Sequence, residues 1–217
     1  MTSSSSRAPY LRLVGDVDTL EVGDGSLLRA LARRERWAAA AAWKRFAPRL
    51  FALLSQSLAR PSESEQLTQE VMLRVLAEVS RTRRPVTLSA LVYGQAARVL
   101  EREFRRESRR RRFWRKPRIS TLELVGVSDH AERAALLRLY DALEQLGAME
   151  RTLFVLHEFE SLSELDLAEA LEWPLSKVKK RLGRAIAKVD GLVECDPVLA
   201  AYLCESKPPE RDLREGA

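Results

Sequence analysis

Residue types that carry much of protein chemistry are scarce in this chain. Its 217 residues include only two cysteines and two histidines. Cys195 and Cys204 stand nine positions apart, without a CxxC spacing and without a histidine nearby in the sequence. We therefore expect no zinc site and no other bound metal. Free thiols in a reducing compartment are the default expectation, with a regulatory disulfide as the alternative.

The residues of an enzyme active site are also missing. Neither His130 nor His157 has a serine, cysteine or second histidine at a useful spacing. The sequence contains no HExxH motif and no glycine-rich phosphate loop. We therefore expect no catalytic residues, no cofactor and no enzymatic activity.

Long hydrophobic runs are absent as well. The longest, from Trp37 to Trp43, is far too short to cross a bilayer. The N-terminal stretch with its Ser3–Ser6 run lacks the apolar segment of a signal peptide. We expect a cytoplasmic protein that has no contact with a membrane.

What the chain has is helical periodicity. Its hydrophobic share of 46% is enough for a core, and apolar residues recur at intervals of three and four. Nowhere do they alternate with polar residues over a useful length, so the sequence predicts an all-α protein. The helical patterns run from Ser26 to about Leu58, over a stretch carrying Leu67, Val71, Leu73, Val75, Leu76 and Val79, and over Leu88–Phe113, Leu136–Leu146 and Arg151–Phe159. Ser62 and Glu65 have the spacing of a capping box at the start of the second pattern.

Breaks in this periodicity predict the domain organisation. Residues around Pro117, Gly126 and Asp129 lose the helical pattern, which indicates a linker. We expect two small helical domains joined by a flexible linker and able to move relative to one another. The expected boundaries are a loose arm over 1–25, a first domain over 26–115, a linker over 116–130, a second domain over 131–192 and a C-terminal tail over 193–217.

The second domain contains the stretch LSELDLAEALEWPLSKVKKRLGR, residues 162–184. It predicts two short helices with a tight break at Glu172–Trp173–Pro174, and Pro174 suits the first turn of the second helix. Five apolar residues are spaced to fill one shared core: Leu167, Leu171, Trp173, Val178 and Leu182. No acidic residue lies between Pro174 and Lys188, while the basic residues there are Lys177, Lys179, Lys180, Arg181, Arg184 and Lys188. This pattern is typical of the recognition helix of a helix-turn-helix. An ordinary helical hairpin with a solvated basic face is the alternative.

The charge is strongly uneven along the chain. The net charge of +6 conceals residues 98–118, which hold eleven basic and three acidic side chains. Residues 132–172 hold ten acidic and three basic side chains, and residues 174–188 hold six basic and none acidic. Two separate basic surfaces on an otherwise acidic chain indicate a polyanionic partner that is contacted twice.

The motifs resemble those of the extracytoplasmic-function sigma factors of bacterial RNA polymerase, in the sigma-70 family. The stretch RTLFVLHEFESLSELDLAEALEWPLSKVKKRLGRA is similar to the family's fourth conserved region, ESEQLTQEVMLRVL to the DAEDLVQEVFLRLW of its second, and LVYGQAARVLEREFRRESRRRR to its WLYRIARNLALDRLRRRRR. The resemblance covers about Leu27 to Val189. The positions of the fourth-region motif are occupied by Arg151, Phe154, Leu156, Leu162, Ser163, Asp166, Leu167, Ala168, Leu171, Val178, Lys179, Arg181, Leu182, Arg184 and Ala185.

The resemblance implies partners and residue roles. The partners would be the RNA polymerase core enzyme and promoter DNA, with association with the nucleoid when the chain is bound to polymerase; an anti-sigma protein is a further partner that the resemblance leaves open. The residues implied in core polymerase binding are Gln66, Gln69, Glu70 and Arg74. Those implied at the −10 element are Arg81, Arg83, Arg84, Arg98, Arg102, Arg105, Arg106 and Arg109. Those implied at the −35 element are Lys177, Lys179, Lys180, Arg181 and Arg184.

Three functions compete at this point. The leading one is a sigma factor that directs core polymerase to specific promoters and aids DNA opening. The second is a stand-alone helix-turn-helix regulator that binds duplex DNA as a dimer without polymerase, although no long heptad supplies a dimer interface. The third is a non-specific nucleic-acid-binding or scaffolding protein, which leaves the QEVMLRVL helix unexplained.

Overall fold

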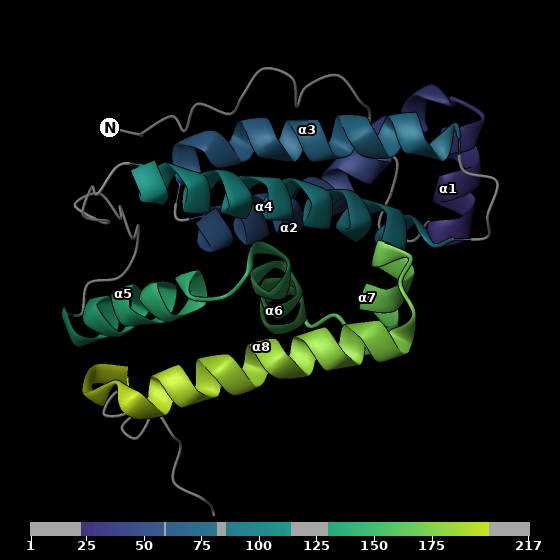
Figure 1. The fold of residues 1–217 in the computed structure, drawn as a ribbon. Coiled ribbons are helices and arrows are strands. Elements are labelled where there is room, and N and C mark those ends of the chain that lie inside the picture. The colour runs from purple at the N-terminus through teal and green to yellow at the C-terminus, as the bar shows by residue number, and fades with distance from the viewer. Residues whose placement is uncertain (1–22, 59, 82–85, 114–129, 200–217) are drawn as a thin grey trace, which may run out of the picture. The chain divides into compact units, whose positions relative to one another are not determined.

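The computed structural model describes residues 23–58, 60–81, 86–113 and 130–199, which hold helices α1 to α8 and no strand (Figure 1). The predicted all-α class is therefore confirmed. The helices are α1 (Asp24–Ala32), α2 (Arg36–Leu58), α3 (Pro61–Val79), α4 (Leu88–Phe113), α5 (His130–Glu144), α6 (Ala148–Glu160), α7 (Glu164–Leu171) and α8 (Leu175–Cys195). The pattern over Leu88–Phe113 matches α4 at both ends. None of the described helices is both long enough and apolar enough to span a membrane.

The helical pattern predicted over residues 26–58 corresponds to two helices, α1 and α2. The periodicity of the apolar residues does not reveal the break between them. Between α1 and α2, Arg34 takes a left-handed backbone conformation with φ of 58°. The Glu35 N–H donates to the Ala30 carbonyl at 3.1 Å, and the Arg34 N–H donates to the Leu31 carbonyl at 2.9 Å. These bonds satisfy the last carbonyls of α1 in the way glycine-ended helices do. The sequence hides the break because an arginine stands where glycine is usual.

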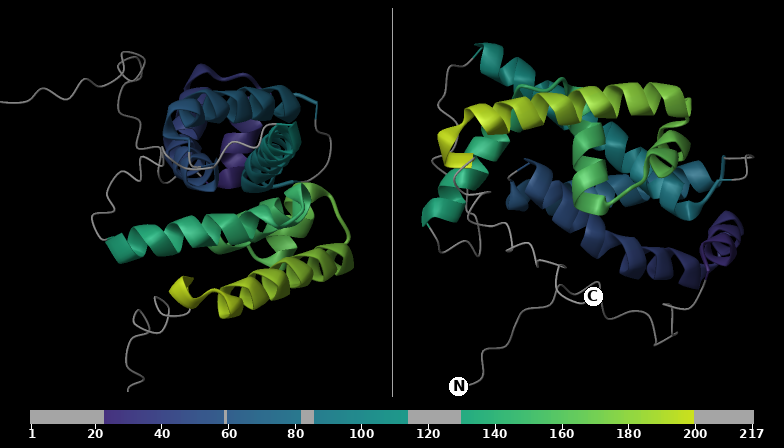
Figure 2. Two further views of the ribbon diagram at one scale, coloured as in Figure 1. Left: turned by 60° about the vertical axis from the view of Figure 1, so that its left-hand side comes forward. Right: turned by 90° about the horizontal axis from the view of Figure 1, so that it is seen from below.

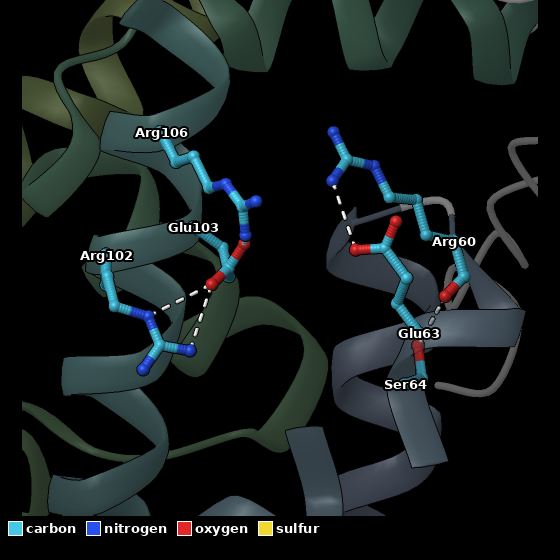
Figure 3. A network of polar contacts seen from close by, with 6 residues as sticks. All are labelled: Arg60, Glu63, Ser64, Arg102, Glu103 and Arg106. Carbon is cyan, nitrogen blue, oxygen red and sulfur yellow. Dashed lines mark hydrogen bonds and ion pairs between the residues drawn. The ribbon is translucent and has the colours of Figure 1, made fainter. Parts of the chain in front are cut away.

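The predicted capping box at Ser62 and Glu65 is wrong. Helix α3 begins two residues earlier than that box would place it, at Pro61, whose missing N–H is no loss in the first turn, and its N-cap is Arg60. The first turn is held instead by Arg60, whose guanidinium Nη1 lies 3.3 Å from Glu63 Oε2 and whose carbonyl accepts a 2.8 Å hydrogen bond from the Ser64 hydroxyl (Figure 3).

The chain divides into two compact units, residues 1–99 with 169–172 and residues 100–168 with 173–217. In the first, α2 and α3 pack side by side, with α1 against both. Small residues on α2, Ala38, Ala41 and Ala42, are buried and permit close helix approach. Larger apolar side chains fill the rest of this core: Leu27, Leu50, Leu53, Leu54, Val71 and Val75.

In the second unit, α8 packs against both α6 and α5, and Figure 2 shows α5 crossing near the C-terminal end of α8. Leu143, Leu146, Phe154, Ala185 and Val189 form one buried cluster. Leu143 lies in α5 and Leu146 follows just after that helix has ended, whereas Ala185 and Val189 are one helical turn apart on α8. Residues 1–22 of the expected arm, 116–129 of the expected linker and 200–217 of the expected tail lie outside the described residues. The domain boundaries given above stay predictions.

Candidate nucleic-acid interface

The helix-turn-helix stretch folds as α7, a tight turn and α8. Glu172 ends α7 with a left-handed backbone, φ of 55°, at the position where such turns usually have glycine. The next N–H, of Trp173, donates to the Ala168 carbonyl at 2.9 Å. Pro174 is the N-cap of α8 and not, as predicted, part of its first turn. Its ψ of 135° is extended, so α8 starts one residue later, and its carbonyl accepts the Lys177 N–H at 2.9 Å.

A capping box that was not predicted begins α7. The Ser163 hydroxyl accepts a 3.1 Å hydrogen bond from the Asp166 N–H, and Asp166 Oδ2 accepts the Ser163 N–H at 2.9 Å. The S-x-x-D spacing in the sequence is a signal that could have revealed it. A capped first helix and a tight turn fix where the second helix starts.

Helix α8 has an apolar side and a basic side. Of the five residues predicted for a shared core, Leu167 of α7 and Val178 and Leu182 of α8 are buried, whereas Leu171 and Trp173 are only half-buried. Lys180 and Arg184 are exposed on the side of α8 opposite the buried residues, one helical turn apart. Neither side chain has an ion-pair or hydrogen-bond partner among the described residues.

Two other basic residues of α8 lie against an aromatic ring. Lys177 Nζ is 3.6 Å from the centroid of the Trp173 ring, and Arg181 Cζ is 5.4 Å from the same centroid. Cations over an indole face are attracted by its negative potential. Lys177 and Arg181 therefore line the flank of α8 next to the turn.

The opposite flank of α8 is partly neutralised. Lys179 Nζ lies 3.6 Å from Glu164 Oε2 at the start of α7. Gly183, between Lys180 and Arg184, has nothing within 4 Å of the position that a Cβ would occupy. The outer strip of α8 therefore carries Lys180 and Arg184, and the position of Gly183 beside them is open.

Helix α4 is less uniformly basic than its sequence suggests. Glu103 is only 5% exposed, and its carboxylate accepts Arg102 Nε at 3.0 Å and lies 3.9 Å from Arg106 Nη1 (Figure 3). Arg105 is paired with Glu101, one turn away. The sequence assigned these arginines to a basic surface. It did not show that they would pair with carboxylates one, three or four residues away.

The remaining basic residues predicted for this surface fall into two groups. Arg98 and Arg109 are exposed, and among the described residues neither has a partner. Arg81, directly after α3, is exposed as well. Arg83 and Arg84 lie outside the described residues.

Arg151, a position of the fourth-region motif, is buried at 4% exposure. Its guanidinium lies 4.1 Å from the centroid of the Phe104 ring, and its Nη1 is 3.2 Å from Glu107 Oε2. A buried charge needs such a partner because desolvation of an unpaired one is costly. The structure assigns this motif residue to packing within the second unit.

The polar residues predicted on α3 share one exposed strip. Gln66 and Gln69 are exposed, Glu70 is half-buried, and Arg74 Nη2 lies 2.7 Å from Glu70 Oε1. Leu73 is 67% exposed on the same strip, although periodicity grouped it with the apolar pattern. The strip is therefore polar, with one exposed apolar side chain among its members.

The histidine on α6 forms a hydrogen bond with the backbone just beyond the end of its helix. His157 Nδ1 is 2.8 Å from the Leu162 carbonyl, across the end of its helix. Within the described ranges, no group of three or more His, Cys, Asp or Glu side chains could hold a metal ion. The charged surfaces of α3, α4 and α8 are thus the candidates for function.

Comparison with known proteins gives two family matches. Residues 42–110 match the model of sigma-70 region 2, and residues 136–189 match that of sigma-70 region 4. Together the two matches span more than half of the chain. No curated protein sequence matches it significantly. Among solved structures, that of CnrH in complex with the cytosolic domain of CnrY is similar, with a TM-score of 0.56 and 19% identity, covering 80% of this chain and 98% of that one.

Proposed function

Because the chain belongs to the sigma-70 family of RNA polymerase sigma factors, we propose that it is a factor of the two-region, extracytoplasmic-function type, and we propose which of its surfaces make the contacts of transcription initiation. The observation that carries the proposal is the exposed pair Lys180 and Arg184 on the outer strip of α8. The family's function, directing core polymerase to promoters, requires such a strip to reach the major groove.

For the −35 element, α8 enters the major groove with Lys180 and Arg184 toward the base edges. Lysine and arginine donate to guanine O6 and N7, the commonest specific base contact. Lys177, Lys179 and Arg181 lie on the flanks of α8, where phosphate contacts suit them better than base contacts.

For the −10 element, the basic residues that follow α3 and those on α4 hold a separated strand. Arg81, Arg83 and Arg84 stand before α4, where a loop can capture a base that has left the stack. Within the described part of the chain, the guanidinium groups of Arg98 and Arg109 on α4 have no partner, while Arg102, Arg105 and Arg106 share theirs with carboxylates. Phosphate contacts by Arg98 and Arg109 would therefore contribute more to affinity.

For the polymerase, the α3 strip of Gln66, Gln69, Glu70 and Arg74 forms the contact. The polar residues of this strip surround the exposed Leu73, which supplies apolar contact area. An interface with one apolar anchor and a polar rim is the usual arrangement.

A protein partner of anti-sigma type is a further part of this proposal. CnrH, similar in fold, is found in complex with the cytosolic domain of CnrY. We extend this to the present chain as a proposal that such a partner binds it. Catalysis of RNA synthesis then belongs to polymerase, and the chain works in the cytoplasm, at the nucleoid when it is bound to polymerase.

Selection of DNA with the reconstituted complex tests this assignment. Purified chain and core polymerase are first checked for co-elution, and random-sequence duplexes retained by the complex are then sequenced. We expect two short elements at a constant spacing, retained only when polymerase is present. A palindromic site retained by the chain alone would support the stand-alone regulator instead.

A further inference from the structure

The carboxylate of Asp24, the first residue of α1, joins three helices of the first unit. Its Oδ2 accepts a 2.7 Å hydrogen bond from the Ser89 hydroxyl and a 3.3 Å hydrogen bond from the Ser89 N–H, in the first turn of α4. Its Oδ1 lies 2.6 Å from Nη2 of Arg45 on α2. Figure 1 shows α1 beside the start of α4. None of the contacts assigned above includes this carboxylate.

The first turn of α4 is held by two side chains from different parts of the chain. Thr87 Oγ1 accepts the Ala90 N–H at 3.1 Å, which is the usual local cap of a helix N-terminus. The Ser89 N–H is another of the donors that a helix leaves without a partner inside itself, and Asp24 accepts it. A negative charge near a helix N-terminus is also favoured by the helix dipole.

Apolar packing gives α4 little that is directional. Its buried side in the first unit includes the small side chains of Ala90, Ala96 and Ala97. Burial of such surface is favourable but has no preferred direction. Hydrogen bonds, by contrast, depend on angle as well as on distance. The contact with Asp24 therefore restrains both the position of α4 along its axis and its rotation.

Residues assigned to the −10 element depend on where α4 starts. The helix is continuous from its first turn to Arg98, so a shift or rotation at Ser89 is carried to the exposed Arg98 side chain. The connection that begins at Arg81, directly after α3, ends at the same first turn. A restraint on Ser89 is thus a restraint on this basic surface.

We propose that Asp24 is a positioning residue for recognition of the −10 element. By binding the start of α4, it holds Arg98 and the end of the connection from Arg81 in the places where they meet the opened strand. Its own charge is repelled by phosphate, so it acts through α4 and not by contact with DNA. The inference rests on the proposed function, because it requires the −10 assignment of these arginines.

Promoter opening by the full chain with core polymerase, followed through 2-aminopurine in the −10 element, tests the proposal. Asp24→Ala should slow opening about tenfold, the loss expected for one hydrogen bond to a charged group, and change the Kd of the closed complex less than about twofold. Asp24→Asn keeps an oxygen acceptor for Ser89 and should restore most of the rate. The effects of Asp24→Ala and Ser89→Ala should not add, because both remove the same hydroxyl contact.

A variant with an equal loss of stability separates positioning from general weakening of the fold. Val71 is fully buried on α3, and Val71→Ala removes only apolar contacts and leaves a cavity. It should lower the melting temperature at least as much as Asp24→Ala and still open the promoter at nearly the unchanged rate, well below both melting temperatures. Opening by Asp24→Ala at the unchanged rate, or slowed no more than in Val71→Ala, would overturn the inference.

Amide hydrogen exchange of the free full chain distinguishes failure of this inference from failure of the proposed function. In Asp24→Ala, the N–H groups of the first turn of α4 should exchange about tenfold faster than in the unchanged chain. If the unchanged chain opens no promoter, the proposed function fails, and faster exchange keeps Asp24 as a positioning residue for α4 without its link to the −10 element. Unchanged exchange at this turn would overturn the inference whatever the polymerase assay gives.

Discussion

Lys177 Nζ lies 3.6 Å from the centroid of the Trp173 ring, across the turn that joins α7 to α8. Arg181 approaches the same ring from one turn further along α8. The two cations are therefore engaged at the flank of the recognition helix. Lys180 and Arg184 lie on the outer strip of this helix, and neither has a partner in the described part of the chain.

Changes on this outer strip should weaken −35 recognition most. Lys180→Ala and Arg184→Ala are each expected to cost about 1–3 kcal/mol of binding to the −35 element and to relax its sequence preference. Lys179→Ala is the comparison: Lys179 is paired with Glu164 and assigned to phosphate, so this change should lower affinity less and leave the sequence preference unaltered. Titration of wild-type and altered −35 duplexes measures the effect. An equal loss for Lys179→Ala would contradict this geometry.

The contact between Lys177 and Trp173 should stabilise the turn. A double-mutant cycle with Lys177→Gln and Trp173→Leu is expected to give a coupling free energy of about 0.5–1 kcal/mol. Urea unfolding of the four proteins provides it. A coupling near zero would mean that the ring and the ammonium group are adjacent without attraction.

Leu73 should be an anchor for core polymerase. Because Leu73 is 67% exposed, Leu73→Ala is expected to leave the melting temperature almost unchanged while weakening polymerase binding about tenfold. Leu165→Ala removes a leucine of equal chemistry that is 65% exposed on α7, and it serves as control. Glu70→Ala should also weaken polymerase binding and leave −35 binding intact. Loss of polymerase binding on Leu165→Ala but not on Leu73→Ala would reject the α3 strip.

Tyr140 should make stability fall in alkaline solution. Burial raises the pKa of its phenol above the ordinary value of 10.0, an effect that the positive charge of Arg151 partly offsets. Above about pH 10 the unfolded chain loses this proton before the folded chain does. The free energy of unfolding then falls with pH, by at most about 1.4 kcal/mol per pH unit for one proton.

Urea midpoints between pH 9 and pH 11 test this dependence, with Tyr140→Phe as the variant that has no proton to lose. The decline should be shallower in Tyr140→Phe than in the unchanged chain. Parallel pH profiles would show that Tyr140 contributes nothing to it.

The sequence predicted the helices better than it predicted their ends. Periodicity placed α4 at Leu88–Phe113 because buried residues recur along one side over many turns. It missed the break at Arg34 because a left-handed arginine leaves no glycine or proline to mark it. It placed a capping box at Ser62 because that spacing fits, although Pro61 allows the helix to start earlier.

The sequence assigned residues to the candidate surfaces, and these assignments stay predictions; it did not predict how the charges on those surfaces are paired. Motif positions identified α8 and the α3 strip, but not which cations already had partners. Glu103 neutralises part of α4 because one-turn spacing and burial hold its carboxylate beside Arg102 and Arg106. Leu73 is exposed because its position on α3 falls outside the buried stripe of Val71 and Val75, which only packing defines.

Run-off transcription with purified core polymerase tests the central claim most directly. The template carries the two selected elements, either fully paired or with the −10 region pre-melted as a bubble. The unchanged chain should give a transcript on both templates. Arg83→Ala with Arg84→Ala should reduce the transcript on the paired template and be partly rescued on the bubble, because these residues act on the opened strand. No transcript from the unchanged chain on either template, together with binding of closed duplex alone, would contradict the account.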